Sequence, residues 1–217
     1  MKIGIIGGTG PEGRGLAVRW AAAGHHVVLG SRDAARASDA ASRLGGAEGS
    51  VKGATNLEAA RISDVVVLSV PFGAQTAVLT ELSPQISGKI ALSVVAPLAF
   101  VAGRARFAPP PTGSAAEEAR LQVPAARWAA GFHTLPAGDL LRAGDPVDAD
   151  VLLCGDDADA KRAAMTLAGD IRGVRAIDAG SLESARYLEA ATALLININR
   201  IYKSHASFRI TGLEKST

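Results

Sequence analysis

The sequence of 217 residues has a single cysteine, Cys154, and few aromatic residues. One thiol excludes an internal disulfide, so the chain gives no sign of an oxidising compartment. Aromatic residues make up 4% of the chain and all hydrophobic residues 48%, so the core must consist chiefly of Ala, Val, Leu and Ile. Such a composition suits an α/β protein.

An excess of charge of one sign and a long hydrophobic run are also missing. With 23 basic and 21 acidic residues the net charge is +2, which argues against a nucleic-acid or membrane-surface partner. The longest apolar stretch, from Ile90 to Ala102, includes Ser93 and Pro97 and is shorter than the roughly 20 residues of a membrane-spanning helix. The apolar stretch near the N-terminus is shorter than the roughly 7–15 residues of a signal-peptide core. We therefore expect a cytoplasmic protein.

Short β-branched segments alternate with longer Ala-rich segments in the first half of the chain. The pattern predicts strands at 2–6, 26–30, 64–70 and 89–95 and helices at 13–23, 33–44 and 74–82. This order predicts a Rossmann-type α/β fold with a doubly wound, mainly parallel sheet.

The second half of the chain begins with a proline-rich segment, 100–112, which we expect to be a loop over the sheet edge. The predicted elements that follow are a helix at 114–122, strands at 128–132 and 150–154, a helix at 158–171, a strand at 174–178 and a helix at 182–202. We expect a nucleotide-binding domain over 1–179 and a small helical region over 180–217 that packs at the cofactor cleft.

A glycine-rich turn follows the first predicted strand. Gly8, Gly10 and Gly13 match the G-x-G-x-x-G pattern, and a second strand ends about 20 residues later, as a dinucleotide-binding unit requires. Such glycines let the backbone approach a pyrophosphate at a helix N-terminus. Pro11 suits the first helical turn, where its missing N–H costs nothing.

The end of the second strand indicates which dinucleotide binds. NAD enzymes usually have Asp or Glu here to accept from the ribose 2′-hydroxyl. This chain instead has Ser31 and Arg32, with Arg36 one helical turn further, and these groups suit a 2′-phosphate. Asp33 is expected to cap the helix that begins there. The sequence therefore predicts NADP(H).

Six sequence blocks occur in an order that resembles the NADPH:coenzyme F420 oxidoreductases over nearly the whole chain. The blocks are 5–13, 30–32, 70–72, 132–136, 154–157 and 178–182. The resemblance implies hydride transfer between NADP(H) and the deazaflavin coenzyme F420, in a homodimer or higher homo-oligomer. It implies no catalytic side chain, because both ligands supply the chemistry, with His133 as an assisting residue at most.

The resemblance also implies which residues hold each part of the ligands. Those for the pyrophosphate are Gly8, Thr9, Gly10, Pro11 and Glu12, and those for the 2′-phosphate are Ser31, Arg32 and Arg36. Those beside the nicotinamide are Val70, Pro71 and Phe72, and those on the floor of the cleft are Ala96, Pro97 and Leu98. Those facing the deazaflavin are His133, Thr134 and Leu135, and the candidates to steer its anionic tail are Arg104, Arg106, Lys203 and Arg209. Phe72 and His133 could equally be core residues.

Other readings of the same fold remain open. A short-chain reductase needs Tyr-x-x-x-Lys, but Tyr187 is followed by Ala191 and Tyr202 by Ala206. An imine or keto reductase of the β-hydroxyacid dehydrogenase type would need roughly a hundred further helical residues, and a non-catalytic NADP sensor would need only the binding site.

The histidines lack metal-ligand spacing, and we expect no metal.

Overall fold

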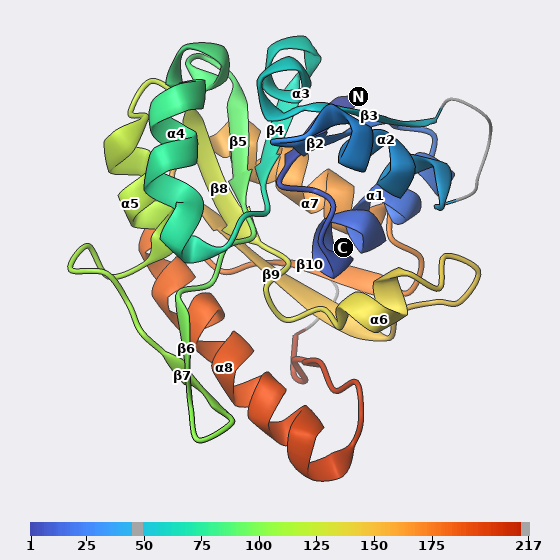
Figure 1. Ribbon diagram of the computed structural model, residues 1–217. Helices are drawn as coiled ribbons and strands as arrows, with labels where there is room; N and C mark the ends of the chain where they lie inside the picture. Colours follow the sequence, from blue (N-terminus) through green and yellow to red (C-terminus); the bar gives the residue numbers. More distant parts are fainter. Residues whose placement is uncertain (45–49, 214–217) are drawn as a thin grey trace.

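The computed structural model describes residues 1–44 and 50–213. Its main feature is one eight-stranded sheet flanked by helices on both faces (Figure 1). The strands are β1 (Lys2–Ile6), β2 (His26–Ser31), β3 (Val51–Thr55), β4 (Val65–Leu68), β5 (Ile90–Ser93), β8 (Arg127–Gly131), β9 (Ala149–Gly155) and β10 (Val174–Asp178). Their order is β10-β9-β8-β5-β4-β1-β2-β3.

Six neighbouring strands, from β8 to β3, run parallel to one another. β9 is antiparallel to β8, and β10 is parallel to β9. The expected doubly wound, mainly parallel sheet is therefore confirmed.

Helices cover both faces of the sheet and bury both sides of its strands. They are α1 (Pro11–Ala22), α2 (Ala34–Ser42), α3 (Asn56–Ile62), α4 (Phe72–Ile86), α5 (Ala115–Gln122), α6 (Ala137–Leu140), α7 (Ala158–Gly169) and α8 (Ala185–Tyr202), with a 3-10 turn, η1, at Leu182–Ser184. Within β4, Val65 and Val67 join one apolar cluster while Val66 and Leu68 join the other. Burial on both faces explains why the strands are continuously hydrophobic.

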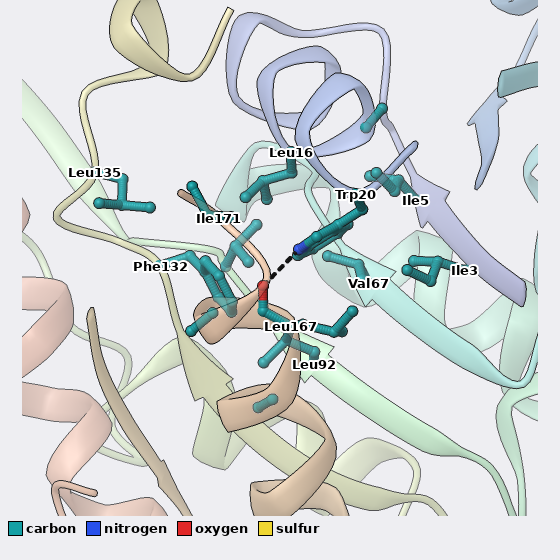
Figure 2. Packing of buried hydrophobic residues seen from close by; sticks show 14 of the residues in the cluster. Ile3, Ile5, Leu16, Trp20, Val67, Leu92, Phe132, Leu135, Leu167 and Ile171 are labelled. Atoms are coloured by element: carbon teal, nitrogen blue, oxygen red, sulfur yellow. Dashed lines mark hydrogen bonds between the residues drawn. The ribbon is translucent and has the colours of Figure 1, made fainter. Parts of the chain in front are cut away.

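The first apolar cluster lies under α1, α2 and α7 (Figure 2). Trp20 from α1 is fully buried there, and its Nε1 donates to the carbonyl of Leu167 on α7 at 2.8 Å. The second cluster lies under α3, α4 and α5. No helix in the described part of the chain is long and apolar enough to cross a membrane.

The segment 51–62, to which the sequence analysis assigned no element, forms β3 and α3. A glycine at the centre of β3 hid the strand, because glycine is a poor strand former. The glycine has a packing reason: a Cβ at Gly53 would lie 2.2 Å from the backbone of Ala37 on α2. α2 can therefore approach this edge strand closely.

The expectation of a loop over the sheet edge at 100–112 is wrong for its first half. Two strands, β6 (Leu98–Val101) and β7 (Arg104–Phe107), form a separate hairpin beside α8 (Figure 1). Asn197 of α8 holds the hairpin, since its amide nitrogen donates to the Ala105 carbonyl at 2.8 Å and its oxygen accepts from the Ala105 N–H at 3.0 Å. The short helix α6 was not expected either.

Candidate functional site

A cavity of about 630 Å³ opens at the carboxyl ends of β1, β2, β4 and β5. Open α/β sheets bind ligands at this edge. The predicted site residues that line the cavity are Thr9, Gly10, Pro11, Glu12, Ser31, Arg32, Arg36, Val70, Pro71, Phe72 and Ala96. Residues from four separate loops are thus brought to one site.

The β1–α1 turn forms the centre of the cavity wall. Gly7 has a φ of +71°, and its N–H donates to the side chain of Asn56 at 3.0 Å. A Cβ at Gly13 would lie 2.6 Å from the Cα of Gly8, so the turn closes only with glycine there. A Cβ at Gly10 would meet nothing within 4 Å, which leaves open space before the N-terminus of α1. This geometry suits an anion.

The end of β2 supplies positive charge to the same cavity. Arg32 and Arg36 line it, and neither guanidinium has a hydrogen-bond or ion-pair partner within residues 1–44 and 50–213. Asp33 is occupied as the cap of α2, because its carboxylate accepts from the N–H of Ala35 at 2.8 Å. The two arginines are therefore available to bind a phosphate.

The start of α4 forms the opposite wall. Phe72 is the first residue of α4, lines the cavity and also packs against the second apolar cluster. Further cavity residues, from α3, α4 and the ends of β4 and β5, were missed by the sequence analysis: Asn56, Ser69, Ala74, Ala77, Val78, Glu81, Val94 and Val95. Four of them lie one helical turn apart on α4, a spacing that could have identified them once the strand end at Val70 was assigned.

Two of the predicted floor residues do not line the cavity. Pro97 and Leu98 form the base of the hairpin, where the carbonyl of Pro97 accepts from the N–H of Ala108 at 2.8 Å. Ala96 is the last cavity residue before this base.

The predicted deazaflavin residues lie beyond the cavity, after β8. His133 is buried, and neither ring nitrogen has a hydrogen-bond partner among the residues that the structure describes. Burial lowers the pKa of His133 to about 4. The nearby backbone of Val95 raises this pKa slightly, but it does not form a hydrogen bond with the ring. The backbone of this loop is tied down, since Thr192 donates to the His133 carbonyl and Ser207 to that of Thr134. Leu135 belongs to the first apolar cluster.

Glu12 differs from the other residues of the glycine-rich turn because it carries an acid. The residue is partly exposed and lines the cavity, but one of its carboxyl oxygens has no exposed surface and no hydrogen-bond partner within 1–44 and 50–213. Burial raises the pKa of Glu12 to about 8. A neutral carboxylic acid therefore lines the cavity at pH 7.

The basic residues proposed to steer an anionic ligand divide into two groups. Arg209 is bound to Asp150 at 2.9 Å and also to Asp148, so its charge is used within the protein. Arg104 and Arg106 lie on β7, and their side chains have no ion-pair partner in the described part of the chain. Lys203, at the end of α8, is exposed and likewise has no ion-pair partner among the described residues. The hairpin arginines and Lys203 are therefore free to meet an anion, whereas Arg209 is not.

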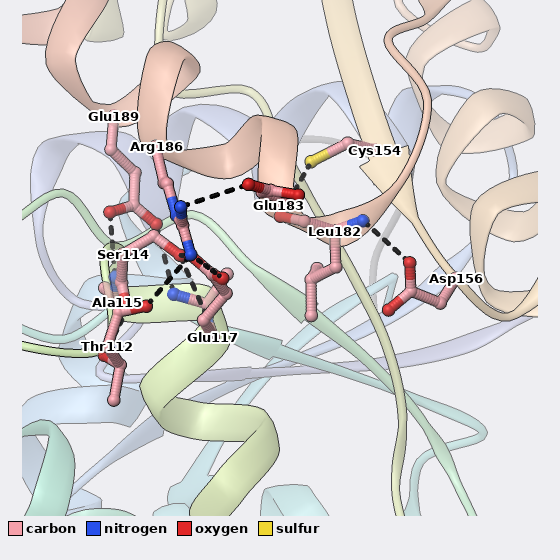
Figure 3. Close-up of polar contacts among 11 residues, drawn as sticks. Thr112, Ser114, Ala115, Glu117, Cys154, Asp156, Leu182, Glu183, Arg186 and Glu189 are labelled. Carbon is pink, nitrogen blue, oxygen red and sulfur yellow. Dashed lines mark hydrogen bonds and ion pairs between the residues drawn. The ribbon is translucent and has the colours of Figure 1, made fainter.

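A second, polar groove of about 320 Å³ lies between α5 and the start of α8 (Figure 3). Beside it, buried Glu189 accepts from the first N–H groups of α5, and burial raises its pKa to about 7. These contacts join α8 to α5.

Comparison with known proteins gives consistent matches. Residues 2–97 match the family model described as NADP oxidoreductase, coenzyme F420-dependent. The F420-dependent NADP reductase of Methanothermobacter thermautotrophicus is 46% identical over 222 residues, which cover 98% of this chain and 96% of that protein.

Solved structures agree on the fold. The crystal structure of a putative F420-dependent NADP reductase from Arthrobacter sp. FB24 superposes with a TM-score of 0.84, at 26% identity, and covers 97% of this chain and 99% of its own. A reductive aminase from Aspergillus terreus superposes with a TM-score of 0.66 at 20% identity, but only 62% of that chain is covered. This second likeness concerns the fold alone.

Proposed function

Since this chain belongs to the family of F420-dependent NADP reductases, we infer that it transfers a hydride between NADP(H) and the deazaflavin coenzyme F420. The observation that carries this conclusion is the 46% identity over 98% of the chain. The alternatives are not favoured: a reductive aminase has a longer chain and is similar only in fold. A pure NADP sensor would not need the family's sequence beyond the nucleotide-binding unit.

We place NADP along the cavity, with its pyrophosphate before the N-terminus of α1. Thr9 and Gly10 line the cavity there, and Gly10 leaves open space before the helix N-terminus, whose free N–H groups suit an anion. The predicted residue Gly8 is not among the lining residues, because it packs against the strands and its N–H donates to the carbonyls of Ile5 at 3.1 Å and Gly30 at 3.0 Å. The 2′-phosphate then meets Arg32 and Arg36, which have no other partner among the described residues, and the hydroxyl of Ser31. The residues present therefore fit the dinucleotide.

The nicotinamide belongs at the other end of the cavity. Val70, Pro71 and Phe72 form one wall at the end of β4, and Ala96 forms the floor after β5. From Arg32 to Ala96 the cavity crosses β2, β1, β4 and β5 in the order of the sheet. This direction brings the ring toward β8 and the loop with His133.

We place the deazaflavin on that side, between the nicotinamide and the loop of His133, Thr134 and Leu135. The two bound ligands supply the hydride chemistry, so this chain has to hold the rings in contact and exclude water. Pro136, Phe132 and the bonds to Thr192 and Ser207 fix the loop. The free arginines of β7, Arg104 and Arg106, are available for the coenzyme's anionic tail.

We also propose a cytoplasmic homodimer, formed by the outer face of α8. Three exposed apolar residues, Tyr187, Leu194 and Ile201, occur seven residues apart on this helix. A seven-residue apolar repeat is typical of helices that pair with another helix. Light scattering tests the proposed dimer. We expect the wild type to be a dimer and Leu194→Glu to be a monomer, and a monomeric wild type would refute the proposed dimer.

The test of the activity is direct. Purified protein mixed with coenzyme F420 and NADPH should change the absorbance of the deazaflavin as it is reduced. Binding of NADPH without this change would favour the sensor. NADPH oxidation with an imine or a ketone, and none with coenzyme F420, would favour the imine or keto reductase instead.

A further inference from the structure

Glu12 is the one acidic residue of the glycine-rich turn, and its surroundings are unusual. It is the second residue of α1, where an ionised carboxylate normally accepts a backbone N–H or is stabilised by the helix dipole. Here one carboxyl oxygen is buried and has no hydrogen-bond partner in the described part of the chain. A buried carboxyl oxygen without a partner implies either that the acid is neutral or that a bound ligand supplies the missing hydrogen bond.

The side of α1 that carries Glu12 can be assigned from its neighbours. Residues three and four apart share a helix face, so Glu12 lies in line with Gly15 and Arg19. A Cβ at Gly15 would lie 2.5 Å from the Cβ of Leu140, and the Nε of Arg19 donates to the Leu140 carbonyl at 2.8 Å. This face of α1 therefore points to α6, which directly follows the loop of His133. From this we infer that Glu12 faces the side of the cavity toward the loop of His133 and away from Arg32.

No charged neighbour accounts for the state of Glu12. The charged or titratable side chains on α1 and on the elements around Glu12 are Arg14, Arg19, Arg32, Arg36, Glu81, His133 and Asp139. Burial alone raises the pKa of Glu12 to about 8, without a contribution from these groups. Asp139 is already paired with Arg142 at 2.6 Å. Glu12 is therefore a neutral acid at pH 7 because of where the fold places it.

We propose that Glu12 is a catalytic residue that donates the proton accompanying hydride transfer to the deazaflavin. The inference rests on the proposed function. In the step, the C4–H bond of the dihydronicotinamide breaks with its electron pair and a C–H bond forms at C5 of the deazaflavin. The negative charge that arrives in the ring is neutralised when the O–H bond of Glu12 breaks and an N–H bond forms at N1. Water then returns a proton to the Glu12 carboxylate, and the reverse reaction uses that carboxylate as the base.

Other titratable groups are less suited to this role. His133 is held neutral, with a pKa of about 4, so it has no proton to give at pH 7. Arg32 and Arg36 lie at the far end of the cavity, and Glu81 is exposed to solvent. Cys154 lies in the second apolar cluster, where burial raises the pKa of its thiol to about 12. Glu12 combines a transferable proton with a place in the cavity.

The kinetic test compares Glu12→Gln with the wild type in single-turnover reduction of coenzyme F420 by NADPH. Loss of a general acid slows such steps by roughly 10²–10⁴-fold, and we expect about 100-fold at pH 7 because the amide can still donate a hydrogen bond. The wild-type rate should fall as the pH rises through about 8, where Glu12 ionises. Glu12→Gln should lack this decrease, and Glu12→Asp, which keeps an acid, should retain it.

A second measurement needs neither ligand. The infrared absorption of a protonated carboxyl group should be visible in the free protein at pH 7 and disappear as Glu12 ionises near pH 8. Glu12→Gln should remove this band. The matched control is Glu189→Gln, which removes a different buried acid, one that titrates near pH 7, and should leave the band of Glu12 and the decrease in rate near pH 8 intact.

The outcomes separate the two proposals. A Glu12→Gln protein that unfolds at the wild-type temperature and reduces coenzyme F420 at the wild-type rate at every pH would overturn the role of Glu12. So would the absence of its infrared band at pH 7. A wild-type protein that shows the band but does not reduce coenzyme F420 would refute the proposed function instead.

Discussion

The ring of Phe132 stands edge-on against the indole of Trp20, with 5.6 Å between the ring centroids and 89° between the planes. Phe132 also has a φ of +68°, in the left-handed region that a bulky residue rarely adopts. It directly precedes His133 in the loop where we place the deazaflavin. The contact with Trp20 thus holds a strained residue at the edge of the site.

Replacing Phe132 should therefore affect both stability and coenzyme binding. Phe132→Ala should lower the free energy of unfolding by about 3–5 kcal/mol, because it leaves a cavity in the first apolar cluster. It should also raise the KM for coenzyme F420. Urea denaturation and steady-state kinetics measure the two effects, and Leu121→Ala, at a position 61% exposed, is the control with little change expected. A loss below about 1 kcal/mol would show that the contact with Trp20 is not needed.

Arg32 should determine the preference for NADPH over NADH. A hydrogen bond to a charged group contributes about 1.5–3 kcal/mol, so Arg32→Ala should raise the KM for NADPH by roughly 10–100-fold. The KM for NADH should change little, because NADH has no 2′-phosphate. Arg43→Ala removes an exposed arginine of the same segment outside the cavity and serves as control. Equal effects on both nucleotides would contradict the assignment.

His133 should assist binding without transferring a proton. Since its pKa of about 4 leaves the ring neutral at pH 7, His133→Ala should lower kcat/KM for coenzyme F420 by about 10-fold, below the roughly 10²–10⁴-fold expected for a general acid or base. The effect should appear mainly in the KM for coenzyme F420. A thousandfold loss of kcat with unchanged coenzyme binding would make His133 the proton donor, and Glu12 would then not be.

Arg19 should stabilise α6 and the turn that follows it, next to the loop of His133. Its guanidinium donates to backbone carbonyls of α6 and the following turn, namely those of Asp139, Leu140, Arg142, Ala143 and Asp145. Arg19→Met leaves these acceptors without a donor and should lower the free energy of unfolding by about 3 kcal/mol. Arg19→Lys should recover only part of this, because an ammonium has fewer donors and no planar fork. Urea denaturation measures these losses, and full recovery of the stability by Arg19→Lys would contradict this role of the guanidinium.

Asp150 should hold the C-terminal tail. Its buried carboxylate accepts from Arg175 at 2.7 Å, from Arg209 at 2.9 Å and from the N–H of Ile210 at 2.6 Å, and these bonds hold its pKa well below the usual range. Asp150→Asn should cost about 2 kcal/mol and speed trypsin cleavage at Arg209. Unchanged cleavage would show that other contacts hold the tail.

The same carboxylate predicts a pH dependence. Because folding lowers the pKa of Asp150 below its unfolded value of 3.8, its stabilisation is complete above that pH and is lost as the pH falls further. Tail cleavage by an acid-active protease should therefore increase below about pH 4 in the wild type. It should be fast at every pH in Asp150→Asn, and a wild-type tail that stays protected at low pH would contradict this role.

Most of the residues that the sequence predicts for the dinucleotide line one cavity, because the predicted site is local. The turn from Gly8 to Gly13 and the charges of Arg32 and Arg36 follow directly after two strands, and parallel strands end at one edge of a sheet. The βαβ order was enough to bring them together. Asp33, expected to be a cap, caps α2 in the structure.

The sequence could not place elements whose conformation depends on distant contacts. β3 has a weak strand pattern and exists beside α2 because Gly53 lets the helix approach. The hairpin of β6 and β7 depends on Asn197, more than 90 residues away along the chain. Neither contact leaves a periodic pattern in the sequence.

By itself, the sequence determined the α/β class and the glycine-rich turn after the first strand, and it predicted NADP(H), because each depends on residues close together in the chain. Only the tertiary structure decided the protonation of Glu12 and His133. Their pKa values are set by burial, which depends on how α1, β5 and the β8–α6 loop pack together. A residue type gives the ordinary pKa of a group, whereas the fold determines how much water reaches it.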